Sequence, residues 1–283
     1  MTDKQCASEI SGSSRGILPV RFGAAACVLT SALLLTSGVA NAQNIHYVFT
    51  KIADSTQVPS VAQASCAAIN LQGTVIFVTN NSVLWRGNGS TLTPLVQPDS
   101  SGQPLTTPCP GTNDNNDLVY AFASATPSYI SLRRQTSAGV TELARSDSGA
   151  YVYVPGGSTI HSLSNDGRTA MAASDGMLYV LPDGVAAFEP DPTLSSLLPG
   201  TMNESHIVVF RAVRQGSGGP VVGIYRGSAT PFIEEGTNGV ELLPAVAPVI
   251  NYHGTVAFVE QSTSGVMRVR STTDGVSFLD HTG

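Results

Sequence analysis

Carboxylates recur along this chain at an almost constant interval. Six short apolar stretches each run into an acidic residue, and these acids are 45, 48, 44, 44 and 45 positions apart. They are Asp54, Asp99, Asp147, Asp191, Glu235 and Asp280. Equivalent positions of a repeat lie at equal height around an axis, so these acids could form a ring that binds calcium, which takes six to eight oxygen ligands. Alternatively each acid caps its own turn through side-chain to backbone hydrogen bonds, which alone explains the repetition.

A second set of acids could serve hydrolysis. They are Asp114, Asp117, Asp166 and Glu204. Glycosidases use two carboxylates that flank the scissile bond, and these four acids fall in predicted turns at the inner end of their repeats. Nothing in the sequence singles out one of them, so no catalytic residue is assigned and an axial hydrolase is the alternative hypothesis. Apart from calcium, we expect no cofactor, because the five histidines lack metal-ligand spacing and no phosphate-binding or nucleophile motif is present.

A turn motif shares the period of the acids. It has the form Asn-x-x-Gly followed by alternating apolar residues, as in Asn70 to Phe77 and Asn251 to Phe258. Asn bonds its own backbone in tight turns and Gly adopts positive φ, so each copy predicts a hairpin turn between the first and second strands of a repeat. The five copies begin at Asn70, Asn113, Ser164, Asn203 and Asn251.

The repeat predicts an all-β fold. Four short strands per 45 residues, without helical periodicity, are typical of a β-propeller blade, which cannot bury both faces alone. We expect about five four-stranded blades. A sixth terminal strand, Tyr47 to Ala53, precedes the first blade and pads or replaces the short last strand, Val276 to Leu279; alternatively, the chain is an incomplete part of a six-bladed ring.

The N-terminus predicts export. Lys4, Arg15 and Arg21 precede an apolar run that ends in Ala40-Asn41-Ala42, the pattern of a signal peptide over residues 1–42. Residues 43–283 then form the propeller domain, without a membrane span, in a secreted or periplasmic protein. The whole chain has 14 basic and 20 acidic residues, and Lys51 is the single lysine of the predicted domain, so nucleic acid is excluded as a partner.

Two cysteines remain after the predicted cleavage, Cys66 and Cys109, each four residues before the anchor residue of its repeat. Equivalent inner positions of neighbouring blades and an oxidising compartment favour a disulfide between blades 1 and 2. Two buried free thiols are the alternative.

The predicted function is an exported scaffold or binding module, with an unknown protein or carbohydrate partner. Rigid propellers bind with loops on one face and at the axial mouth. The longest irregular stretches, Asp99 to Thr112 and Val213 to Val221, are therefore candidate contact segments. Trp85 could stack on a sugar ring, but it occupies the third-strand position held by Tyr179 and Tyr225, which favours packing between blades.

Residues 49–54 and 250–258 resemble the repeat units of an uncharacterised family of secreted bacterial β-propeller proteins. Members often carry a C-terminal surface anchor, but this chain ends in Asp280-His281-Thr282-Gly283 without one. The resemblance implies the fold and export, and it brings no catalytic residues.

Overall fold

The computed structural model describes residues 50–54, 56–58, 67–149, 153, 161–236, 240–243, 246–261 and 265–281. Every named element among them is a β-strand. The predicted signal peptide, residues 1–42, and Cys66 lie outside the described residues. Among the described residues, no helix has the length and apolar character needed to cross a membrane.

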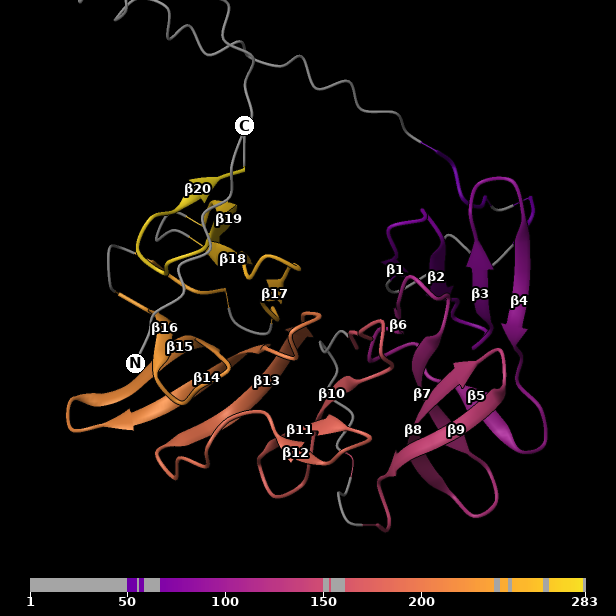
Figure 1. Cartoon of the computed structure of the whole chain (residues 1–283), viewed down its shortest axis with the longest axis horizontal. Coiled ribbons are helices and arrows are strands. Elements are labelled where there is room, and N and C mark those ends of the chain that lie inside the picture. The colour runs from indigo at the N-terminus through magenta and orange to yellow at the C-terminus, as the bar shows by residue number, and fades with distance from the viewer. Residues whose placement is uncertain are drawn as a thin grey trace, which may run out of the picture. The chain divides into compact units, whose positions relative to one another are not determined.

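Five antiparallel sheets form the blades of a five-bladed β-propeller (Figure 1), which confirms the predicted fold class. In every blade except the second, the strands form a meander and follow one another in the sequence. In the first, fourth and fifth blades, the first strand lies nearest the centre of Figure 1. Blade 1 contains β1 (Ala67–Ile69), β2 (Val75–Val78), β3 (Leu84–Gly87) and β4 (Leu92–Val96).

Blade 2 departs from the four-strand pattern at its inner edge. Its strands are β5 (Gly102–Pro104), β6 (Gly111–Thr112), β7 (Leu118–Ser124), β8 (Tyr129–Thr136) and β9 (Gly139–Arg145). Both β5 and β6 pair with β7, so two short pieces replace one first strand. Pro108 and Pro110 lie between the pieces, and proline has no N–H for a ladder. The stretch Asp99 to Thr112, predicted to be an irregular contact segment, is therefore in the sheet only at β5 and β6, and residues 105–110 between them form no named strand.

Blade 3 has three named strands: β10 (Thr169–Ala172), β11 (Leu178–Leu181) and β12 (Val185–Ala186). Isolated bridges, Leu163 to Thr169 and Tyr153 to Ala173, stand where the other blades have a first strand. This blade accordingly carries the least regular inner edge of the described chain.

Blades 4 and 5 keep the four-strand meander. The prediction of an irregular segment from Val213 to Val221 is wrong. Strands β14 and β15 include most of these residues and pair with each other as far as Gly216 and Gly219. Only the two residues between those glycines therefore form the loop of this hairpin. The strands are β13 (Leu194–Met202), β14 (Val208–Gly216), β15 (Gly219–Arg226), β16 (Pro231–Glu234), β17 (Val249–Ile250), β18 (Val256–Gln261), β19 (Met267–Thr272) and β20 (Leu279–Asp280).

The hydrophobic core consists of four clusters, one between each pair of consecutive blades in the described part of the chain. Ile76 of blade 1 packs with Tyr120 of blade 2, and Phe210 of blade 4 stacks on Phe188, which follows blade 3, with ring centroids 4.7 Å apart. Apolar burial of this kind is the main favourable term in folding. Blade-to-blade packing therefore holds blades 1 to 5 in sequence order.

The segment before blade 1 is not where we expected it. Its described part, residues 50–54, has no strand assignment and lies against blade 1, because a Cβ on Gly87 would stand 2.7 Å from Ile52 and one on Gly89 would stand 2.3 Å from Thr50. The two glycines leave room for this close approach. The prediction that this part of Tyr47 to Ala53 pads the last strand of blade 5 is therefore wrong; residues 47–49 lie outside the described residues.

Candidate axial binding site

Five turns that join the first and second strands converge around the axis, and each is built by its own sequence. In every turn the side-chain oxygen of the first residue accepts the backbone N–H of the residue four positions later, at 2.9–3.0 Å. The fourth residue has a positive φ of 60–86°. Gly fills this left-handed position in three turns, and Asn116 and His206 fill it in blades 2 and 4. The predicted Asn-x-x-Gly turns are thus confirmed.

Hydrogen bonds from one turn to the next join blades 1 to 4. Each runs from the backbone N–H of the second turn residue to the side chain of the second residue in the following blade. The three bonds are Leu71 to Asp114 Oδ1, Asp114 to Asn165 Oδ1 and Asn165 to Glu204 Oε2, each 2.9 Å long. We call the second residues of the five turns, Leu71, Asp114, Asn165, Glu204 and Tyr252, the mouth ring.

Arginines of the third strands make a further contact between blades. Arg86, Arg134 and Arg226 occupy equivalent positions, because each pairs with the same register position of the second strand. Each guanidinium donates to the carbonyl of the fourth turn residue in the next blade, at 2.7, 2.7 and 3.2 Å. The equivalent residues of blades 3 and 5 are Val180 and Ser271. We call this contact, made by Arg86, Arg134 and Arg226, the arginine latch; it is present at three junctions between blades.

The turns enclose a cavity of about 420 Å³, which we call the axial cavity. All five mouth-ring residues line it, so every blade contributes to one site. Its buried lining residues are apolar in Leu163, Met202 and Ile250 and polar in the anchor residues Asn70, Asn113 and Asn203. Leu71 is 92% exposed and Tyr252 is 69% exposed, so both are open to a ligand. A concave site that combines apolar lining residues with convergent polar groups is the usual form of a small-ligand site.

The axial cavity is acidic. Asp114 and Glu204 line it, and in the described part of the chain no lysine, arginine or histidine does. Both oxygens of Asp114 accept hydrogen bonds, from Leu71 and from Asn165 Nδ2 at 3.2 Å. Glu204 accepts one bond through Oε2, and its Oε1 accepts none from the described residues. The free oxygen of Glu204 can therefore accept a donor from a ligand.

The other two acids of the predicted catalytic group do not line the cavity. Asp166 forms ion pairs with Arg168 and with His206, whose Nε2 lies 3.0 Å away. Burial works to raise the pKa of Asp166, but the hydrogen bond from Ser164 and the two basic partners outweigh it and lower that pKa. Asp117 donates its backbone N–H to the side chain of Asn113 in its own turn. Of the four predicted acids, the structure thus brings together two.

Five of the six periodic acids serve local turns or ion pairs through their carboxylates. Asp54, Asp99 and Asp191 each accept the backbone N–H of the residue two positions on, at 2.7–2.9 Å. These bonds confirm the capping role. The hydroxyl of the same residue binds the carboxylate too, and the pKa values of Asp99 and Asp191 are lowered by these bonds. Lys51 is the largest cause that lowers the pKa of Asp54.

The remaining three periodic acids differ. Asp147 is paired bidentately with Arg145 at 2.8 Å, which lowers its pKa. Asp280 lies 3.9 Å from Arg268, and Glu235 donates its backbone N–H to Val222. Among the described residues, no three His, Cys, Asp or Glu side chains come together as a metal site requires. Calcium binding by the periodic acids stays a prediction.

Other residues singled out from the sequence lie away from the axial cavity. Trp85 is half-buried in β3, opposite Phe77 and Pro94 on the neighbouring strands. Cys109 is partly buried, and because Cys66 lies outside the described residues, their disulfide stays a prediction. His206 and His253 occupy turns, as expected.

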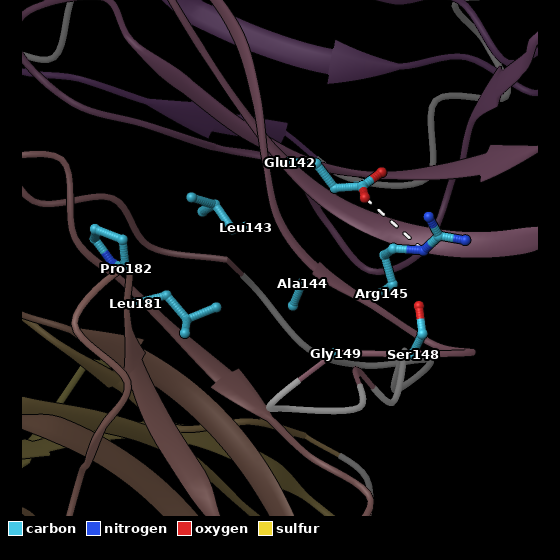
Figure 2. Close-up of a pocket in the computed structure, with 8 residues that line it drawn as sticks. All are labelled: Glu142, Leu143, Ala144, Arg145, Ser148, Gly149, Leu181 and Pro182. Carbon is cyan, nitrogen blue, oxygen red and sulfur yellow. Dashed lines mark ion pairs between the residues drawn. The ribbon is translucent and has the colours of Figure 1, made fainter.

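A second cavity, of about 270 Å³, lies between blades 2 and 3. Figure 2 shows Leu143 and Ala144 on one side, facing Leu181 and Pro182 on the other, with the ion pair of Glu142 and Arg145 at one end. Arg145 also stacks on Tyr129 and is paired with Asp147. Its guanidinium is thus already held by protein groups. Residues from two blades line this cavity, compared with five for the axial cavity.

The sequence predicted two of the five mouth-ring residues as candidate site residues. Asp114 and Glu204 are candidates because they are acids, whereas the side chains of Leu71, Asn165 and Tyr252 point to no chemistry by themselves. A signal was present, because alignment of the five turns places these residues in one column, directly after the anchor residue. That column differs in every repeat.

Comparison with known proteins gives no family. No protein family profile matches the chain, and no curated protein matches it. Similar solved structures include the fucose-specific lectin from Aleuria aurantia, which is 15% identical over 76% of this chain and 75% of that chain, with a TM-score of 0.40. A lectin from Burkholderia pseudomallei is 12% identical over 76% and 69%, with a TM-score of 0.40, and YCF48 bound to D1 peptide is 13% identical over 83% and 70%, with a TM-score of 0.44. These likenesses are too distant to support an argument about this chain.

Proposed function

We propose that this protein is an exported binding module that holds a carbohydrate in the axial cavity. One observation carries the proposal: five blades contribute one mouth-ring residue each to a single cavity of about 420 Å³. The turn that carries each residue is fixed by the same internal hydrogen bond. A rigid scaffold with different side chains at equivalent positions suits recognition.

The chemistry of the cavity favours a sugar. A pyranose has a face of C–H groups and an edge of hydroxyls, so it needs both an aromatic surface and planar polar groups. Tyr252 supplies an exposed ring, and Asn165 and Glu204 supply an exposed amide and a carboxylate oxygen. Tyrosine combines a large contact surface with a polar tip, which fits a ligand of this kind.

A hydrolase is the second candidate, because Asp114 and Glu204 line the same cavity. Such an enzyme would use one as an acid and the other as a base or nucleophile. Both carboxylates already accept hydrogen bonds from backbone N–H groups of the preceding blades, which assigns them a structural task. Release of reducing sugar that is lost in Glu204→Gln would favour the enzyme over the binding module.

The carbohydrate proposal is tested by calorimetric titration of the purified chain with an oligosaccharide panel, comparing Tyr252→Ala with Met267→Ala. Met267 is 62% exposed on β19 and does not line the axial cavity, so it is a matched control for loss of surface apolar area. We expect Tyr252→Ala to weaken binding about tenfold through loss of ring contact, and Met267→Ala to leave it unchanged. Equal affinities in the two variants would show that the sugar does not bind at the mouth ring.

Export belongs to the same proposal. Residues 1–42 act as the signal peptide, and the mature protein begins at Gln43 and works outside the cytoplasm, where a Cys66 to Cys109 disulfide can persist. Mass spectrometry of the exported protein without reduction tests both points. A chain that retains residues 1–42, or a free thiol at both cysteines, would contradict them.

A further inference from the structure

The mouth ring has two unlike halves. Asp114, Asn165 and Glu204 follow one another in blades 2, 3 and 4 and are linked by hydrogen bonds, so they form a continuous polar arc. Tyr252 and Leu71 belong to blades 5 and 1, and they form an exposed apolar arc. A ligand in the axial cavity therefore meets apolar surface on one side and hydrogen-bond acceptors on the other.

The polar arc is rich in acceptors and negative in charge. It contains two carboxylates, and among the described residues no cationic side chain lines the cavity to neutralise them. The latch arginines Arg86 and Arg134 donate to turn carbonyls of the next blade. Oε1 of Glu204 accepts no hydrogen bond within the described chain. An anionic ligand would be repelled here, and a ligand with a positively charged donor would be attracted.

Resting on the proposed function, we infer that the ligand is an amino sugar. Its C–H face lies on Tyr252 and Leu71, and its protonated amine faces Glu204 and Asp114. The aromatic ring also attracts a nearby ammonium group through its negative face. The two arcs thus select a molecule that combines an apolar face with a cationic edge. A neutral or acidic sugar of the same size lacks the cationic edge.

The inference is tested by calorimetric titration of the full chain with three oligosaccharides of equal length. They are a glucosamine oligomer, its N-acetylated counterpart and an oligogalacturonate, at mildly acidic pH so that the amine is protonated. We expect the glucosamine oligomer to bind at least about tenfold more tightly than the N-acetylated one, and the oligogalacturonate not to bind. The preference should shrink as salt is added, because exposed charges are screened.

Glu204→Gln is the decisive variant, because Gln keeps an oxygen for the Asn165 N–H and removes the charge. It should abolish the preference for the glucosamine oligomer over its N-acetylated counterpart, because the charge that attracts the amine is gone. Glu189→Gln is the matched control: Glu189 is exposed outside the cavity, so the net charge changes equally and the preference should remain.

The outcomes separate this inference from the proposed function. Equal binding of the amine and N-acetyl oligomers would overturn the inference and leave carbohydrate binding intact. Failure of every oligosaccharide to bind would overturn both. A lysine-rich peptide that binds as tightly as the glucosamine oligomer, with the same dependence on Glu204, would overturn the assignment to a sugar.

Discussion

The turns of blades 1 to 4 and the turn of blade 5 share a fold but differ in their surroundings. The first turn residues of blades 1 to 4, Asn70, Asn113, Ser164 and Asn203, are at most 9% exposed, whereas Asn251 of blade 5 is exposed. All five make the same internal hydrogen bond. Local sequence therefore builds the turn, and the neighbouring blade decides whether that turn is buried.

Blade 5 differs in its surface as well. Met267, Val269 and Leu279 are exposed on β19 and β20, and none of the four core clusters of the described chain joins blade 5 to blade 1. Ser271 stands where blades 1, 2 and 4 have a latch arginine. Each of the four junctions from blade 1 to blade 5 therefore has a hydrophobic cluster, whereas the described residues show no such cluster between blade 5 and blade 1.

The largest expected effect compares the anchor residues of blades 2 and 5. Asn113→Ala removes a bond to the carbonyl of Ser164 and two bonds from backbone N–H groups in its turn. We expect it to lower the free energy of unfolding by about 4 kcal/mol, because buried partners lose their hydrogen bonds. Asn251→Ala, at the exposed turn, should cost about 1 kcal/mol. Urea denaturation measures both, and equal losses would remove the distinction between the blades.

The second prediction concerns pH and the junction of blades 2 and 3. His161 is 5% exposed, bonded to Tyr153 Oη at 3.0 Å, and burial lowers its pKa from 6.5 to about 4. The unfolded chain binds a proton more readily, so His161 contributes full stability above pH 6.5 and loses it as the pH falls towards 4. The loss should reach about 3 kcal/mol.

Denaturation of His161→Gln across this pH range measures that contribution. The variant should show a much smaller decline in stability between pH 6.5 and 4 than the parent chain. His253→Gln is the matched control, because His253 is exposed in the turn of blade 5. The account of the buried junction is wrong if His161→Gln keeps the full pH dependence.

The smallest effect tests the arginine latch. Arg134→Ala removes the bond to the carbonyl of Gly167 in the next blade and should cost about 1.5 kcal/mol, since a charged donor holds a turn carbonyl. Arg268 of blade 5 is 46% exposed and lies 3.9 Å from Asp280, so Arg268→Ala should change stability by less than about 0.5 kcal/mol. Thermal unfolding of the two variants is the measurement. A larger loss in Arg268→Ala would reverse the comparison.

The sequence predicted the fold because the period and the turn chemistry are local. Asn or Ser at the first turn position and Gly at the fourth are needed for the same geometry in each repeat, so they recur visibly. The predicted third-strand position of Trp85, Tyr179 and Tyr225 lies in β3, β11 and β15. The course of residues 50–54 was predicted wrongly, because it depends on space beside Gly87 and Gly89, which no local pattern reports.

The site was harder to predict than the fold. Acids were the obvious candidates, but Asp117 and Asp166 have the same chemistry as Asp114 and Glu204. They differ in turn position: the second turn residue lines the cavity, whereas Asp166 is the third and Asp117 the fifth, and neither lines it. Tyr252 and Leu71 carry no chemical signature of their own. Their importance comes from their place in the mouth ring, which depends on the arrangement of all five blades.

The direction of the bonds in the mouth ring has a consequence for synthesis of the chain. Leu71, Asp114 and Asn165 each donate a backbone N–H to a residue of the following blade. A nascent chain that emerges from its N-terminus therefore completes each junction only when the next repeat has appeared. Folding can then advance blade by blade in the order of translation, because each new blade accepts the hydrogen bonds that the preceding blade donates.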